Sequence, residues 1–96
     1  MEKFIELLQE YLIKAIDLTE KMIHEDYKQT ERIALMSENR ERLMFIINQV
    51  ASFITWEDVS DENKMHLNKQ IDYIKKLDEE LLVKLQEFKT EVQEEI

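Results

Sequence analysis

Residues 33–54 read IALMSENRERLMFIINQVASFI, and this stretch decides how the rest of the chain is interpreted. Within it, apolar side chains recur in steps of three and four residues, which is the spacing of positions that share one face of an α-helix. The resulting seam consists of Ile33, Met36, Arg40, Leu43, Ile47, Val50 and Ile54. A second apolar strip, made of Leu35, Ile46 and Phe53, lies about 90° around the same helix. A helix with two apolar strips usually has a neighbour on each side, so we expect this segment to be the middle helix of an antiparallel bundle.

Composition points to helix along nearly the whole chain. The 96 residues include no glycine and no proline, whereas average proteins contain about 7% and 5%. Without glycine, tight turns that need a positive φ are difficult to build, and the abundant Leu, Glu, Lys, Gln and Met favour helices. We therefore predict a single all-α domain over residues 1–96, folded as an elongated antiparallel three-helix bundle with helices at about 2–24, 27–55 and 61–94.

The first break is only weakly marked. Asp26 and Gln29 have the spacing of a capping box, which places the start of the second helix near Tyr27. A continuous helix through residues 24–27 is the alternative. The second break is clearer, because Ser60 is a good N-cap and is followed by the acidic residues Asp61 and Glu62. The seam predicted for the third helix consists of Leu67, Ile71, Ile74, Asp78, Leu81, Leu85, Phe88 and Val92.

One charge interrupts each of the two later seams. If the second and third helices form a hairpin that turns near residues 58–59, facing residues have numbers that add up to about 118, as those of Arg40 and Asp78 do. A half-buried charge without a partner is costly, so we predict an ion pair between Arg40 and Asp78 that fixes the helix register. The alternative is that both side chains reach solvent at the edge of the seam.

The charge and composition exclude several classes of protein. A net charge of −9, without a basic patch, argues against nucleic-acid binding. Cysteine is absent, which excludes disulfides and thiol catalysis. No run of about 18 apolar residues suggests insertion into a membrane, and the N-terminal residues lack the apolar core of a signal peptide. We expect a cytoplasmic protein.

We find no pattern that indicates catalysis or metal binding. His24 and His66 are expected near opposite ends of the bundle, and neither has a partner at metal-binding spacing. The paired carboxylates are typical of a solvated helix face. The sequence therefore predicts no catalytic residue, no cofactor and no metal site, and we expect a protein that is not an enzyme.

The second helix carries more apolar surface than one hairpin seam can cover. The surplus residues are Met44, Phe45, Ile46, Phe53 and Trp56. One interpretation is that the first helix or a second copy of the chain covers them, which would make the protein a self-associating structural module. The other is that they form a docking groove for a helix of a partner protein. The residue pattern leaves both open.

Three stretches resemble the flagellar FliT-type export chaperones. Tyr11-Leu12 with Leu18-Thr19-Glu20-Lys21-Met22 is similar to the start of that family's first helix. Asp26-Tyr27 and the later Glu41-Arg42-Leu43 resemble its second helix. Ile74-Lys75-Lys76-Leu77-Asp78-Glu79-Glu80-Leu81 resembles its late helix. A separate fourth helix, which some members use to cover the binding groove, is not evident.

This resemblance implies an acidic, all-helical chaperone that holds the C-terminal region of the filament-cap protein before export. Its mechanism would be reversible masking of an amphipathic helix. Related chaperones that serve the hook–filament junction proteins are a close alternative. On this reading, the residues that contact the partner would be Met44, Phe45, Ile46, Phe53 and Trp56.

Overall fold

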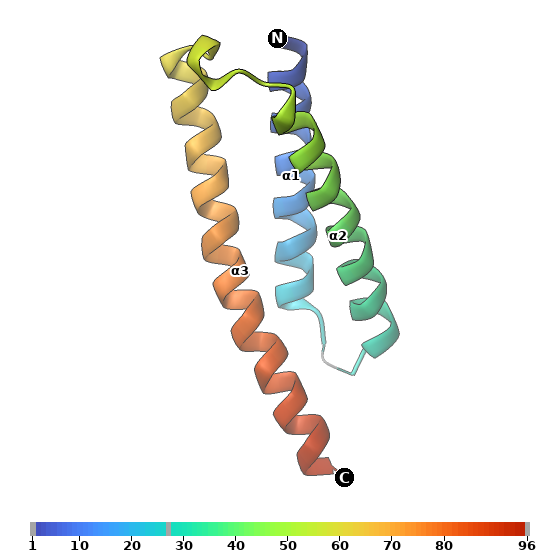
Figure 1. Ribbon diagram of the computed structural model, residues 1–96. Helices are drawn as coiled ribbons and strands as arrows, with labels where there is room; N and C mark the ends of the chain where they lie inside the picture. The colour runs from blue at the N-terminus through green and yellow to red at the C-terminus, as the bar shows by residue number, and fades with distance from the viewer. Residues whose placement is uncertain (1, 27, 96) are drawn as a thin grey trace.

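The computed structural model describes residues 2–26 and 28–95, and side chains within this range as far as residue 87. The chain forms three long helices, α1 (Glu2–His24), α2 (Thr30–Ser52) and α3 (Asp61–Glu95), with a short 3₁₀ turn, η1 (Trp56–Asp58), before α3 (Figure 1). Its principal dimensions are 54 × 20 × 16 Å. The prediction of an elongated all-α three-helix bundle is confirmed.

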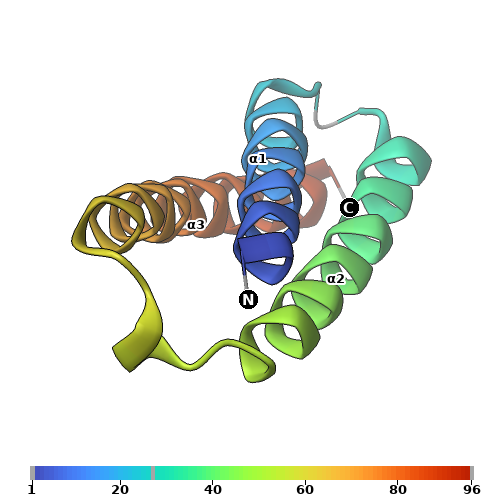
Figure 2. The ribbon, with the colours of Figure 1, turned by 90° about the horizontal axis from the view of Figure 1, so that it is seen from above.

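The middle helix of the bundle is α1. It packs along both α2 and α3, which lie on either side of it and scarcely approach one another (Figure 2). The buried face of α1 repeats in steps of three and four residues and consists of Ile5, Leu8, Leu12, Ala15, Thr19 and Met22. The expectation that residues 33–54 form the middle helix is therefore wrong.

The two apolar strips of α2 are buried to different extents. No residue of the first strip is exposed, and Met36, Ile47 and Ile54 are buried. In the second strip, Leu35 is 58% exposed and Phe53 is 63% exposed. A second apolar strip thus did not indicate a second neighbour, and it leaves apolar surface on α2.

The break between α1 and α2 differs from the predicted capping box. Asp26 Oδ1 accepts a hydrogen bond from the N–H of Lys28 at 3.0 Å, and the Asp26 carbonyl accepts one from the N–H of Gln29 at 2.9 Å. These bonds make a turn, so α2 begins at Thr30, three residues later than expected, and Gln29 at its N-cap makes no side-chain capping bond. The predicted start at Tyr27 lies outside the described residues. Residues 25, 26, 28 and 29 are not helical, so the alternative of one continuous helix is wrong.

Apolar side chains of the second linker, between α2 and α3, pack into the core. The helix α2 ends at Ser52, three residues earlier than expected, and the N–H groups of Phe53 and Ile54 make 3.1 Å bonds that tighten its last turn. Ile54 and Val59 are both buried in the core. Ser60 caps α3 as predicted, because its Oγ accepts a hydrogen bond from the N–H of Asn63 at 3.2 Å.

The helices α1 and α3 are parallel to one another, and α2 is antiparallel to both (Figure 1). The C-terminal end of α1 is held by Lys84 of α3. Its Nζ donates hydrogen bonds to the carbonyl oxygens of Met22 (2.9 Å), Ile23 (2.6 Å) and Glu25. A cation at this position satisfies carbonyls that the helix leaves without partners and favours the negative end of the helix dipole.

Candidate functional site: a groove between α2 and α3

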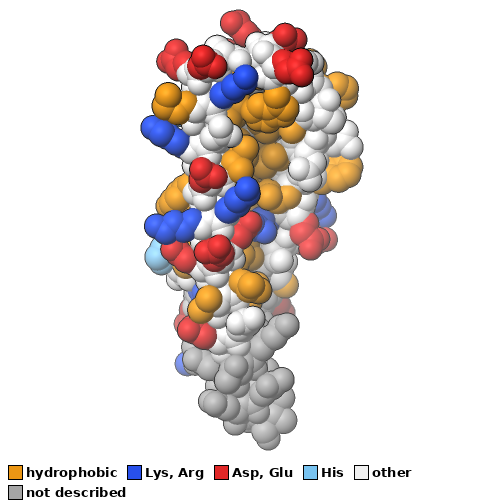
Figure 3. Space-filling view, turned by 60° about the vertical axis from the view of Figure 1, so that its left-hand side comes forward, with side chains coloured by type: hydrophobic (Ala, Val, Ile, Leu, Met, Phe, Trp, Pro, Cys, Tyr) orange, Lys and Arg blue, Asp and Glu red, His pale blue; other side chains and the backbone are white. Residues whose placement is uncertain are grey.

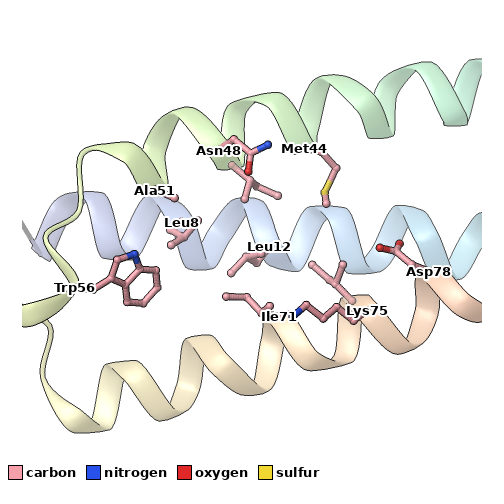
Figure 4. A pocket seen from close by; sticks show the side chains of 11 residues that line it. Leu8, Leu12, Met44, Asn48, Ala51, Trp56, Ile71, Lys75 and Asp78 are labelled. Atoms are coloured by element: carbon pink, nitrogen blue, oxygen red, sulfur yellow. The ribbon is translucent and has the colours of Figure 1, made fainter.

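Since α2 and α3 scarcely approach one another, they leave an apolar groove between them, and α1 forms its floor (Figure 4). Leu8 and Leu12 of α1 line the bottom. The walls are Met44, Ile47 and Ala51 of α2, and Ile71 and Ile74 of α3. The volume of the groove is about 320 Å³.

The groove is visible on the surface of the molecule. Figure 3 shows hydrophobic side chains gathered in a hollow of the upper half, with basic and acidic side chains around it. Asn48 on α2 and Lys75 on α3 are the polar side chains at its edges (Figure 4). An apolar trough with polar edges matches the cross-section of an amphipathic helix, whose apolar stripe would face inward.

Trp56 lies at one end of the groove, next to the linker (Figure 4). The turn η1 presents it, because the N–H groups of Asp58 and Val59 bond to the carbonyls of Thr55 (2.9 Å) and Trp56 (3.2 Å). The buried side chain of Val59 anchors this turn to the core. The indole itself is 39% exposed, so a large aromatic surface is available at the mouth of the groove.

A polar layer lies at the other end of the groove. Arg40 of α2 forms an ion pair with Asp78 of α3, and its Nε donates a 2.9 Å hydrogen bond to Thr19 Oγ1 of α1. The Thr19 hydroxyl in turn donates to the carbonyl of Ala15 at 2.7 Å. The predicted pair is thus present, and Thr19 is a third member that sequence reasoning missed.

This layer separates two apolar clusters in the core. The larger cluster includes Leu12, Ile47 and Ile74, while the smaller one consists of Met22, Met36 and Leu81 with half-buried neighbours. Partial burial lowers the pKa of Arg40 from its ordinary value, because the guanidinium has lost part of its hydration. The hydrogen bonds to Thr19 and Asp78 compensate that loss, and they join α2 to α3 where the groove ends.

The five residues expected to contact a partner lie in different places. Met44 and Trp56 line the groove. Phe45 and Ile46 instead line a shallow depression on another side of α2, together with Glu38, Glu41 and Arg42. Phe53 stacks on Phe4 of α1, with 5.4 Å between the ring centroids and 19° between the ring planes. The structure therefore divides the predicted patch between two separate surfaces and an aromatic pair.

Several residues that line the groove also belong to the core. Leu8 and Leu12 of α1 and Ile74 of α3 are buried in the larger apolar cluster, and Ile71 of the predicted α3 seam packs against it. Their spacing correctly indicated inward-facing side chains. It carried no signal that two of the three helices stay apart, so the floor and one wall of the groove were missed.

The histidine and acidic side chains are scattered. Within the described part of the chain, no group of three or more His, Cys, Asp or Glu side chains could hold a metal ion. His24 is exposed near one end of the bundle, and His66 is exposed beside Glu62 and Lys69 near the other. Among the described residues, none of the helices combines the length and apolar character needed to cross a lipid bilayer.

Comparison with known proteins gives no family for this chain. A scan of protein-family models matches none of them, and searches of curated proteins and of solved structures find no significant match. The groove is therefore the structural feature that bears on function.

Proposed function

We propose that the protein is a flagellar export chaperone that acts in the cytoplasm, and that it binds an amphipathic C-terminal helix of an export substrate such as the filament-cap protein. The observation that carries the proposal is the open apolar groove between α2 and α3. The resemblance of three stretches to FliT-type chaperones is the reason for choosing this class of partner.

The dimensions of the groove suit about two turns of a helix. Its walls run from Met44 to Ala51 on α2 and from Ile71 to Asp78 on α3. Each wall spans seven residue steps, or about 10 Å at 1.5 Å per residue. A partner helix could therefore insert apolar side chains from positions i, i+3 or i+4, and i+7, which is the usual pattern of helix-in-groove recognition.

The mechanism would be reversible masking without covalent chemistry. An amphipathic helix that is needed later for assembly exposes an apolar stripe, which promotes premature self-association. Contact with the partly exposed side chains of Ala51 and Ile71 would cover that stripe, and the indole of Trp56 would close over one end. Met44 supplies a flexible thioether that can adapt to partner side chains of different shape.

Trp56 provides a direct test, because it is the protein's single tryptophan and lies in the groove. Synthetic peptides from the C-terminal regions of a filament-cap protein and of a hook–filament junction protein would be titrated into the intact chain. We expect a saturable blue shift of Trp56 fluorescence with the first peptide, and a Kd of about 1–100 µM.

Two groove variants and one matched control sharpen the result. Met44→Glu places a charge in the wall, and Ala51→Phe fills the cavity without adding charge, so each should weaken binding by at least about tenfold. Val83→Glu makes a similar change at an exposed residue of α3 that does not line the groove, and should bind normally. Circular dichroism would establish that all three variants remain helical.

Two outcomes would count against the proposal. One is the absence of binding of the cap-protein peptide by both fluorescence and calorimetry. The other is equal affinity in wild type, Met44→Glu and Ala51→Phe, because the peptide would then bind elsewhere. Tighter binding of the junction-protein peptide would keep the groove but assign it to the related group of chaperones.

A further inference from the structure

A second unpartnered surface lies on the side of α2 that faces away from the rest of the bundle. Residues in steps of three and four form an exposed strip there, which we call the outer strip and which consists of Glu31, Leu35, Glu38, Arg42, Phe45 and Gln49. All six side chains are exposed, and Leu35 and Phe45 are the large apolar ones. No described helix covers this side of α2 (Figure 2).

The outer strip is separate from the groove. At about 100° per residue, its centre lies roughly 150° around α2 from Met44 and Ala51, which line the groove. Phe45 belongs to the shallow depression that Glu38, Glu41 and Arg42 share. A helix bound in the groove would therefore leave the outer strip uncovered.

The order of chemical types along the outer strip is symmetric about residue 40. The strip residues nearest to residue 40 on either side are Glu38 and Arg42, which carry opposite charges. The next strip residues on either side are Leu35 and Phe45, which are both apolar. Glu38 and Arg42 already approach one another along the helix at 3.4 Å, which shows that the two side chains share one face. Beyond the apolar pair, Glu31 and Gln49 form a polar outer pair.

We propose that the occupant of the outer strip is the α2 helix of a second copy, running antiparallel about a two-fold axis near residue 40. In this register each Phe45 packs on Leu35 of the other copy. Each Arg42 faces the other copy's Glu38, and each Gln49 faces its Glu31. The interface rests on self-complementary charge as well as on apolar surface.

The charges disfavour the parallel arrangement. A parallel pair in register would place Glu38 opposite Glu38 and Arg42 opposite Arg42, and like charges at facing positions repel. Two copies also carry a net charge of −9 each, so the local Glu–Arg pairs must act against an overall repulsion. The antiparallel register is the one that turns both charged positions into attractions.

A single pair of crossing helices buries less than the roughly 1,200–2,000 Å² of a standard stable interface. The dimer is therefore weak, with a Kd on the order of 10 µM or more. Sedimentation equilibrium of the intact chain over this concentration range, at physiological ionic strength, should show a mass that rises from monomer to dimer. A monomer at every concentration up to about 1 mM would overturn the proposal.

Charge variants test whether the strip itself is the interface. Glu38→Arg places two arginine side chains opposite one another, the new one and Arg42 of the other copy, and should weaken the dimer by at least about tenfold. The double variant Glu38→Arg with Arg42→Glu restores opposite charges across the two-fold axis and should dimerise about as well as wild type. If the double variant is as weak as the single one, the proposed pairing is wrong.

Cross-linking tests the register directly, because the natural chain contains no cysteine. In the antiparallel dimer, residue 31 of one copy faces residue 49 of the other, whereas two copies of residue 49 lie about 27 Å apart along the helix axis. A mixture of Glu31→Cys and Gln49→Cys chains should form the mixed disulfide, and neither variant alone should cross-link. Cross-linking of Gln49→Cys with itself would overturn the antiparallel register.

These outcomes are distinguishable from those of the groove experiment. Phe45→Glu should abolish dimerisation and leave the peptide-induced shift of Trp56 fluorescence unchanged. Met44→Glu should have the opposite pattern. Loss of dimerisation in Met44→Glu, with no effect of Phe45→Glu, would place the self-association in the groove and overturn the assignment of the outer strip.

Discussion

The helices α1 and α2 have the same length, 23 residues each, yet they are buried to very different extents. The helix α1 buries six residues along one continuous seam, whereas α2 buries only Met36 and Ile47 among its described residues. The difference arises because α1 has a neighbour on two sides and α2 has one. Apolar content alone therefore does not show which helix is central, and the uncovered apolar surface of α2 is where binding is expected.

The largest expected effect compares one leucine from each helix. Leu12 of α1 is 3% exposed, and Leu35 of α2 is 58% exposed. We expect Leu12→Ala to lower the free energy of unfolding by about 3 kcal/mol, because it removes packed methyl groups and leaves a cavity. Leu35→Ala should cost less than about 0.5 kcal/mol. Urea denaturation of both variants checks this, and equal losses would contradict the burial difference.

The polar layer gives the next largest effect, because it joins α2 to α3 where their backbones stay apart. Arg40→Gln and Asp78→Asn should each lower the free energy of unfolding by about 1 kcal/mol, since Asp78 is partly solvated and the pair is screened. A double-mutant cycle should give a coupling energy of about 0.5–1 kcal/mol. A coupling of zero would mean that the pair does not fix the register of α2 against α3.

The two helices also differ in how their ends are held. Lys84 Nζ satisfies three carbonyls at the end of α1, whereas the N-cap of α2 has no side-chain hydrogen bond. We expect Lys84→Met to cost about 0.5–1 kcal/mol and to speed amide hydrogen exchange near the end of α1. Lys76→Met, at an exposed position of the same helix, is the matched control and should change neither quantity.

The smallest effect concerns a surface bond between α1 and α3. Tyr73 donates a 2.7 Å hydrogen bond to Glu20 Oε1, and this bond, followed by a small desolvation and the nearby negative charge, raises the pKa of Tyr73 above its ordinary value. A raised pKa in the folded state means that the bond stabilises the protein below the unfolded pKa of about 10. The contribution is lost as the pH rises through the folded pKa.

Tyr73→Phe removes this bond, so the difference in Tm between wild type and variant should be present at pH 8 and should shrink above about pH 10. Thermal melts across that range provide the measurement. An unchanged difference at high pH would indicate that the Tyr73 hydroxyl contributes nothing through Glu20.

Much of the fold could be predicted because helical periodicity reports which face of each segment is buried. It located α1 and α3 closely and identified the inward seams of α2 and α3 as far as residue 87. The positions of Phe88 and Val92 in the α3 seam lie outside the described side chains. The prediction that Arg40 and Asp78 pair assumed a hairpin of α2 and α3, and the two side chains meet although these helices scarcely approach one another.

The arrangement of the three helices could not be predicted in the same way. Periodicity defines the buried face of a helix but not which other helix covers it, and the second strip of α2 was misread for that reason. Thr19 was missed because a threonine on the buried face of a helix does not indicate by itself which side chain of another helix it binds. Its role depends on the hydrogen bond from Arg40. The start of α2 moved because the Asp26 side chain closes a turn instead of capping a helix.

The parallel pairing of α1 and α3 has a consequence for how the chain acquires its structure. The helix α1, which forms the middle of the core, is synthesised before the other two. One side of it is covered only by α3, where Lys84 binds the carbonyl of Met22, 62 residues earlier in the chain. The local α1–α2 hairpin can form early, whereas docking of α3 requires closure of a long loop. Until that docking, Leu8 and Leu12 remain open to solvent, so the nascent chain passes through a stage in which its own core helix is vulnerable to aggregation.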